Sequence, residues 1–221
     1  MDPNYVQYIQ EGLVAYLILC ASIALHEFGH AKAADKLGDF LPRSQGRVTL
    51  NPLVHLDPIG TGLIPLATIF LRLPFAMIGW GRPVEISLPN PATRRRDDIL
   101  ITLAGPAMNG LIALAATFTH AAVWRFLNSA TAASIIPLLD EVVVINCMLI
   151  AFNLIPIPPL DGSRIMRYAV GMSEEVFQKF SMMSWILLIV LINLRPFQVF
   201  LNWLILEVAA PFGMLLALLT R

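Results

Sequence analysis

Long apolar stretches separated by short polar ones are the dominant pattern of this chain. Five stretches are each close to the roughly 20 mostly apolar residues that an α-helix needs to cross a bilayer. They are residues 10–34, 98–124, 137–156, 176–194 and 197–219. The pattern predicts an all-α polytopic membrane protein with about five to six transmembrane helices.

A sixth apolar stretch, residues 57–80, does not fit a simple crossing. It is long enough to span the membrane, but it contains several residues that disfavour one continuous apolar helix. These are Gly60, Gly62, Pro65, Arg72 and Pro74.

Basic residues indicate how the chain is oriented. They gather in three clusters: Lys32, Lys36, Arg43 and Arg47; Arg94–Arg96; and Arg164, Arg167 and Lys179. Loops rich in Lys and Arg stay in the cytoplasm, so we expect an N-terminus outside and all three clusters inside. A single crossing by 57–80 would place Arg94–Arg96 outside. We therefore expect a membrane-embedded segment near 47–80, re-entrant or extended, with zero net crossings; a bent pair of half-helices satisfies the same rule.

Composition agrees with a membrane protein and limits its partners. Of 221 residues, 57% are hydrophobic and 14% charged, whereas a soluble domain has about 25% charged residues. The net charge is zero and no long basic block is present, so the expected partner is the lipid bilayer and not nucleic acid. The length predicts a single membrane-embedded domain, 1–221, with a core of about 10–170 and C-terminal helices at about 176–219.

The sequence HEFGH, residues 26–30, places ionisable side chains inside the first apolar stretch. His26 and His30 are four residues apart, so they share one helical face and can bind one metal ion. Glu27 follows the first histidine and is placed to act as the general base that activates the attacking water. Ionisable groups at this depth are costly and are typical of a functional site.

A catalytic zinc ion needs a third protein ligand and one open position. The remaining candidates are His55, Glu85, His120 and Asp161. Asp161 follows Pro156, Pro158 and Pro159, which end the preceding helix near Leu154; a plain turn at the membrane edge is the alternative. The histidines lie toward the C-terminal end of one helix, and Asp161 lies just beyond the C-terminal end of another. To share one metal ion, these two helices must run parallel. They do so only if 57–80 makes zero net crossings, which the charges also require. We therefore predict Asp161 as the third ligand.

Three further polar residues are candidates for contacts with the substrate or the transition state: Asn109, Asn153 and His55. Amides in spanning helices face the bundle interior, where Asn109 and Asn153 can instead serve to join helices. His55 has a structural alternative as well, which is to anchor its loop together with Asp57.

Several motifs resemble those of the site-2 protease family of intramembrane zinc metalloproteases (M50-like). They are HEFGH (26–30), AGPAMN (104–109) and NLIPIPPLDG (153–162), while NPLVHLDPIGT (51–61) and GWGRPVEI (79–86) resemble the short branch without PDZ or CBS domains. The resemblance covers about residues 15–170. It implies that His26, His30 and Asp161 bind one zinc ion and that Glu27 is the general base. It also implies that the substrates are transmembrane segments of other proteins, hydrolysed within or near the bilayer in regulated intramembrane proteolysis.

Two other functions are compatible with metal-binding residues in spanning helices. A metal transporter would be expected to place more ligands along a path and often to have repeated halves, and no repeat is present. A catalytically inactive membrane scaffold would not need Glu27. The sequence thus favours a zinc metalloendopeptidase integral to the cell membrane, with its active site toward the cytoplasmic side.

Overall fold

The computed structural model describes residues 3–72 and 79–221. The chain divides into two compact units, Met1–Pro89 and Asn90–Arg221, which are described in turn. The sequence prediction of a single domain, 1–221, stays a prediction.

The first unit is built on the long helix α1 (Pro3–Lys36), with the short helix α2 (Leu41–Ser44) after it. Two short helical turns follow, η1 (Pro52–Val54) and η2 (Pro58–Leu63), and η2 continues directly into α3 (Ile64–Phe70). Together η2 and α3 form an apolar helical stretch of 13 residues, which at 1.5 Å per residue is too short to cross a hydrocarbon core of about 30 Å.

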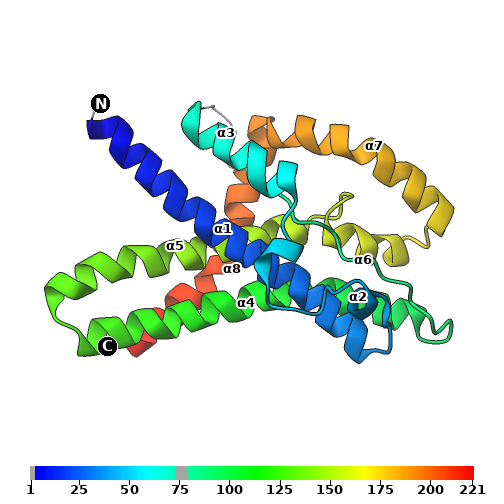
Figure 1. Ribbon diagram of the computed structural model, residues 1–221, viewed down its shortest axis with the longest axis horizontal. Coiled ribbons are helices and arrows are strands. Elements are labelled where there is room, and N and C mark those ends of the chain that lie inside the picture. The colour runs from blue at the N-terminus through cyan, green and yellow to red at the C-terminus, as the bar shows by residue number, and fades with distance from the viewer. Residues whose placement is uncertain (1–2, 73–78) are drawn as a thin grey trace. The chain divides into compact units, whose positions relative to one another are not determined.

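Helix α3 lies beside the N-terminal half of α1 (Figure 1). The Tyr5 hydroxyl donates to the carbonyl of Phe70, and the guanidinium of Arg72 stacks on the rings of Tyr5 and Tyr8 at 4.7 and 5.0 Å. The end of α3 therefore lies near the start of α1, so the two helices run in opposite directions.

The chain then returns to the point where this excursion began. Leu56 and Gly81 form an isolated antiparallel bridge, and the amide of Arg82 donates to the carbonyl of His55 at 2.7 Å. Residues 73–78, including Pro74 of the predicted segment, lie outside the described residues. The two ends of the 57–80 segment thus lie side by side, as a segment with zero net crossings requires.

The second unit contains the helices α4 (Arg94–Phe126), α5 (Ser129–Asn153), α6 (Asp161–Ala169), α7 (Glu174–Ile192) and α8 (Arg195–Leu219). A two-residue link makes α4 and α5 an antiparallel pair, joined near the link by His120 and Asp140 at 2.7 Å. Helix α8 packs on both, and α7 contacts α8. Ile155, Leu160 and Leu188 form a small apolar core between α5, α6 and α7.

The predicted fold class is confirmed. Over the described ranges the structure has eight α-helices and no strand beyond the Leu56–Gly81 bridge, and five of the helices are long and apolar enough to cross a membrane. These are α1, α4, α5, α7 and α8, the five predicted from the sequence. The protein is therefore an integral membrane protein by the length and composition of its helices.

One predicted boundary is wrong. Helix α5 begins at Ser129 instead of near Pro137, which lies inside the helix. Asn128 caps the helix by accepting a hydrogen bond from the amide of Thr131 at 2.9 Å. A spanning helix accommodates an internal proline when its neighbours satisfy the freed backbone groups, so the proline does not end it.

Candidate active site

His26 and His30 lie on one face of α1, one turn apart. Their Nε2 atoms are 3.0 Å apart and their ring centroids 4.6 Å apart, and both side chains are buried. The continuous helix sets this separation, because side chains at i and i+4 stack on the same face.

This donor pair fits a zinc ion. Zinc binds imidazole nitrogen at about 2.0–2.1 Å, so two such bonds from one ion readily span a 3.0 Å gap between Nε2 atoms. Neutral imidazole is also among the ligands that zinc prefers.

Glu27 lies against the returning extended segment at Gly81. A Cβ atom on Gly81 would come within 3.0 Å of Cγ and 3.1 Å of Oε1 of Glu27, and within 2.8 Å of Ile23. Only glycine lets the backbone pass this close, so the extended segment after residue 79 runs directly beside the predicted general base.

A buried arginine holds this returning segment in place. The guanidinium of Arg47 is 4% exposed and donates to two backbone carbonyls, those of Val54 and Arg82. It therefore ties the loop before η2 to the extended segment beside Glu27.

Asp39 makes a second link to the same segment. It is 2% exposed and accepts hydrogen bonds from the Ser87 hydroxyl at 2.7 Å, the Leu88 amide at 2.9 Å, the Leu41 amide at 3.1 Å and the Ser87 amide. Burial alone raises the pKa of this carboxyl, but the hydrogen bonds from Ser87, Leu88 and Leu41 outweigh it, so the pKa lies below its ordinary value.

Neither anchoring residue was predicted from the sequence, where Arg47 belongs to a basic cluster that sets orientation and Asp39 has no predicted role. Neither residue belongs to a motif that separates it from a surface charge, so no signal in the sequence could have identified them.

His55 is completely buried at the end of η1. One ring nitrogen, Nε2, lies 2.9 Å from the carbonyl of Thr49. The loop-anchoring partner is thus Thr49 instead of Asp57, because the Asp57 carboxylate accepts from the amides of Ile59 and Gly60 and caps η2. A contact between His55 and substrate stays a prediction.

In the second unit, the predicted helix break lies where the prolines placed it. Helix α5 ends at Asn153, and Asp161 is the first residue of α6. A Cβ atom on Gly162 would lie 2.3 Å from the carbonyl oxygen of Leu154, so only glycine allows α6 to start against the last turn of α5. This close approach sets where Asp161 sits at the end of α5; its role as zinc ligand stays a prediction.

The two candidate asparagines make hydrogen bonds within the second unit. Asn109 is fully buried and donates to the side-chain oxygen of Asn146 at 2.9 Å, which joins α4 to α5. Asn153 donates to the carbonyl of Leu149 at 3.0 Å, one turn back along its own helix. The first contact is the helix-joining role that the sequence left open, and catalytic roles for both residues stay predictions.

The remaining ligand candidates have partners elsewhere. Glu85 accepts from Gln45 at 2.7 Å in an exposed position, and His120 pairs with Asp140 as described above.

The spanning helices and the paired histidines of α1 define an integral membrane protein with two metal-binding side chains on one helix face. Comparison with known proteins indicates a membrane-associated protease. Residues 121–194 match Peptidase family M50. The chain is 36% identical over 164 residues to "Putative zinc metalloprotease YwhC" of Bacillus subtilis, covering 72% of this chain and 70% of that protein.

Two mycobacterial relatives are similar as well. "Putative zinc metalloprotease Rip2" of Mycolicibacterium smegmatis is 32% identical over 142 residues, and the protein of the same name from Mycobacterium tuberculosis is 32% identical over 158. Each of these two alignments covers 64% of this chain but only about half the length (51%) of the Rip2 protein. No solved structure matches. The chain belongs to peptidase family M50.

Proposed function

We propose that this protein is an intramembrane zinc metalloendopeptidase that hydrolyses peptide bonds within or near the transmembrane segments of other membrane proteins. One observation carries the proposal most directly. The His26–His30 pair and Glu27 lie within a helix long and apolar enough to span the membrane, and an extended segment passes beside the Glu27 carboxylate.

His26, His30 and Asp161 would hold one zinc ion. When bound, the ion supplies Lewis-acid chemistry, which polarises the substrate carbonyl and makes water a nucleophile at neutral pH. The donor set of two imidazoles and one carboxylate is typical of catalytic zinc sites.

Glu27 is the residue of the chain that moves the proton. Glu27 takes the proton from the attacking water and gives it to the nitrogen of the leaving amine as the peptide C–N bond breaks. Since a helical substrate hides its carbonyls in hydrogen bonds, the segment to be cut must unwind locally before this step.

The orientation of the chain follows from the charges. An N-terminus outside the cell places the three basic clusters in the cytoplasm. His26 follows Gly12 by 14 residues, which is about 21 Å of helix, so the site would lie roughly 10 Å below the cytoplasmic surface. Such a site suits regulated intramembrane proteolysis of segments already in the bilayer.

Cleavage of a tagged membrane-span substrate by the purified protein and by Glu27→Gln tests the proposal, with zinc content measured for both. Glu27 is not a ligand in this mechanism, so the variant is expected to keep its zinc and to lose at least about 10²-fold in rate.

Equal cleavage by both proteins would contradict the mechanism. Zinc movement across vesicles without cleavage would instead favour a transporter, and zinc binding with neither activity would favour an inactive scaffold.

A further inference from the structure

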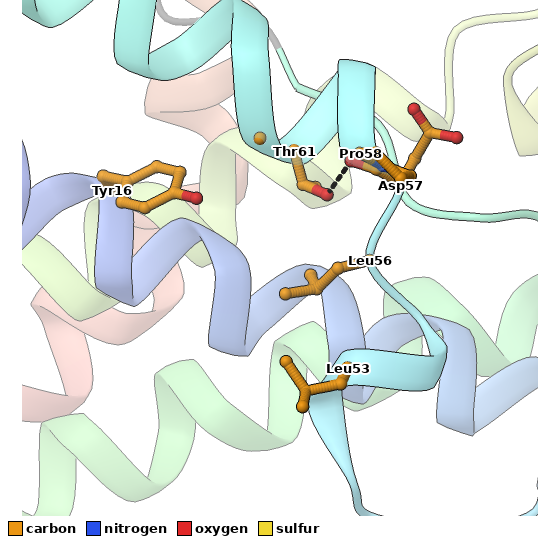
Figure 2. A pocket seen from close by; sticks show the side chains of 7 residues that line it. Tyr16, Leu53, Leu56, Asp57, Pro58 and Thr61 are labelled. Atoms are coloured by element: carbon orange, nitrogen blue, oxygen red, sulfur yellow. Dashed lines mark hydrogen bonds between the residues drawn. The ribbon is translucent and has the colours of Figure 1, made fainter.

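A pocket of about 210 Å³ lies within the first unit, between α1 and the loop that carries η1 and η2 (Figure 2). Tyr16 of α1 forms one side. The other side is formed by Leu53, Leu56, Asp57, Pro58, Thr61 and Gly62. An apolar cavity of about 150 Å³ is large enough for benzene, so this pocket can take a leucine or phenylalanine side chain.

Gly81 connects the lining of the pocket to the predicted general base, Glu27. Leu56 lines the pocket and pairs with Gly81, and Gly81 packs against Glu27. Along α1, Tyr16 precedes Glu27 by 11 residues, which is three helical turns, so the two side chains lie on one face about 16 Å apart. An extended peptide covers that distance in about five residues.

The polar atoms of the loop that forms this wall are satisfied within the loop. The Thr61 hydroxyl donates to the carbonyl of Asp57 at 2.7 Å, and the Asp57 carboxylate accepts from the amides of Ile59 and Gly60. Figure 2 shows that carboxylate directed away from Tyr16. Asp57 is thus the charged residue of the lining, but its carboxylate is engaged by the amides of Ile59 and Gly60, and the rest of the loop side is mainly apolar. Such a surface suits an uncharged, apolar side chain.

We infer that this pocket is a substrate subsite that receives one large apolar side chain of the unwound segment, within about five residues of the bond that is cut. The inference rests on the proposed function and extends it from the reaction to the choice of substrate. An acyl chain of a lipid is the competing occupant, but a lipid would have no reason to affect which sequence is cut.

Gly62 provides a way to fill the pocket. A Cβ atom there meets only the carbonyl oxygen of Asp57, at 4.0 Å, so the position accepts a side chain, and Gly62→Leu adds bulk to the lining of the pocket. Tyr16→Ala does the opposite and enlarges the pocket. Gly213 on α8 has open space around it, and Leu17 is 65% exposed, so Gly213→Leu and Leu17→Ala are the matched controls.

The experiment measures kcat/KM for a panel of tagged membrane-span peptides in phosphatidylcholine vesicles. Each peptide carries Ala, Leu or Phe at one position within five residues of the cleaved bond. At one position, the unmodified protein is expected to prefer Leu or Phe over Ala by about 10–200-fold. Gly62→Leu is expected to reduce or reverse this preference, and Tyr16→Ala to shift it toward the larger side chain, while both controls keep the original ratio.

A loss of folding lowers all rates together and leaves the ratios unchanged. Ratios that stay constant in both pocket variants while the overall rates are retained therefore overturn the inference. The same holds if the unmodified protein shows no preference at any position, or if only a lipid occupies the pocket. If it cleaves none of the peptides while it binds zinc, the proposed function fails, and the subsite inference fails with it.

Discussion

At the scale of single residues, buried polar side chains hold the loops beside α1 through hydrogen bonds to residues distant in the sequence. Asp39 is the clearest case, because four hydrogen-bond donors from three residues converge on its carboxylate. The contribution of Asp39 to the stability of the folded state depends on the carboxylate being ionised.

Asp39 predicts a pH dependence of stability. The folded pKa of this carboxyl lies below its ordinary value, so the folded state binds the proton less well than the unfolded state. The stabilisation is complete above the unfolded pKa of about 3.9 and is lost as the pH falls through the folded pKa. Thermal unfolding of the detergent-solubilised protein should show Asp39→Asn less stable than wild type at pH 7, with a difference that shrinks below about pH 4.

The exposed Glu85→Gln is the control for Asp39→Asn and should change little at either pH. A difference between Asp39→Asn and wild type that grows on acidification would contradict the assignment.

Gly162 is a second residue that decides local structure, because its lack of a Cβ atom lets α6 start against the end of α5. Gly162→Ala would put a Cβ atom 2.3 Å from the Leu154 carbonyl oxygen, and overpacking of this kind costs about 1–3 kcal/mol. Because the clash displaces the start of α6, we expect a lower zinc content as well, measured on the purified protein. Gly110→Ala is the control, since its Cβ meets only Ile150 at 3.9 Å; equal zinc content in both variants would separate Asp161 from the metal site.

At the scale of elements, the returning segment depends on Arg47, which joins two loops that make no regular sheet. Arg47→Met keeps most of the side-chain volume but removes charge-assisted hydrogen bonds worth about 1.5–3 kcal/mol each. We expect faster proteolysis of residues 47–57 and slower substrate cleavage, with zinc content unchanged, because His26 and His30 belong to α1.

Arg94→Met is the matched control for this change. The Arg94 side chain is 52% exposed and pairs at 3.8 Å with Glu174, whose side chain is 44% exposed; exposed pairs of this kind contribute about 0–1 kcal/mol. Proteolysis of Arg47→Met at the wild-type rate would show that the loop holds its place without the arginine.

At the scale of the whole molecule, the orientation in the membrane can be tested directly. Single cysteines at Gln7, Ala92 and Ser129, in a background without Cys20 and Cys147, would be treated with a membrane-impermeant maleimide on intact cells. We expect labelling at Gln7 and Ser129, and labelling at Ala92 only after permeabilisation, because 57–80 makes zero net crossings. Labelling of Ala92 from outside would mean that this segment crosses once.

The sequence predicted the elements better than their ends. Five spanning helices and the break before Asp161 follow from local signals: apolar length and proline chemistry. The predicted start of α5 near Pro137 was wrong, because the helix begins after the cap at Asn128 and accommodates the proline inside a spanning helix.

The sequence by itself determined the spanning helices, the family of the protein and the pairing of His26 with His30, because each depends on residues that are close along the chain. Only the tertiary structure decided that Gly81 returns to Leu56 beside Glu27, that Arg47 and Asp39 hold it there, and that Tyr16 borders a pocket. Those contacts join residues from about 7 to 54 positions apart. Their formation depends on the shape of the packed loop, which no helical period or motif spacing encodes.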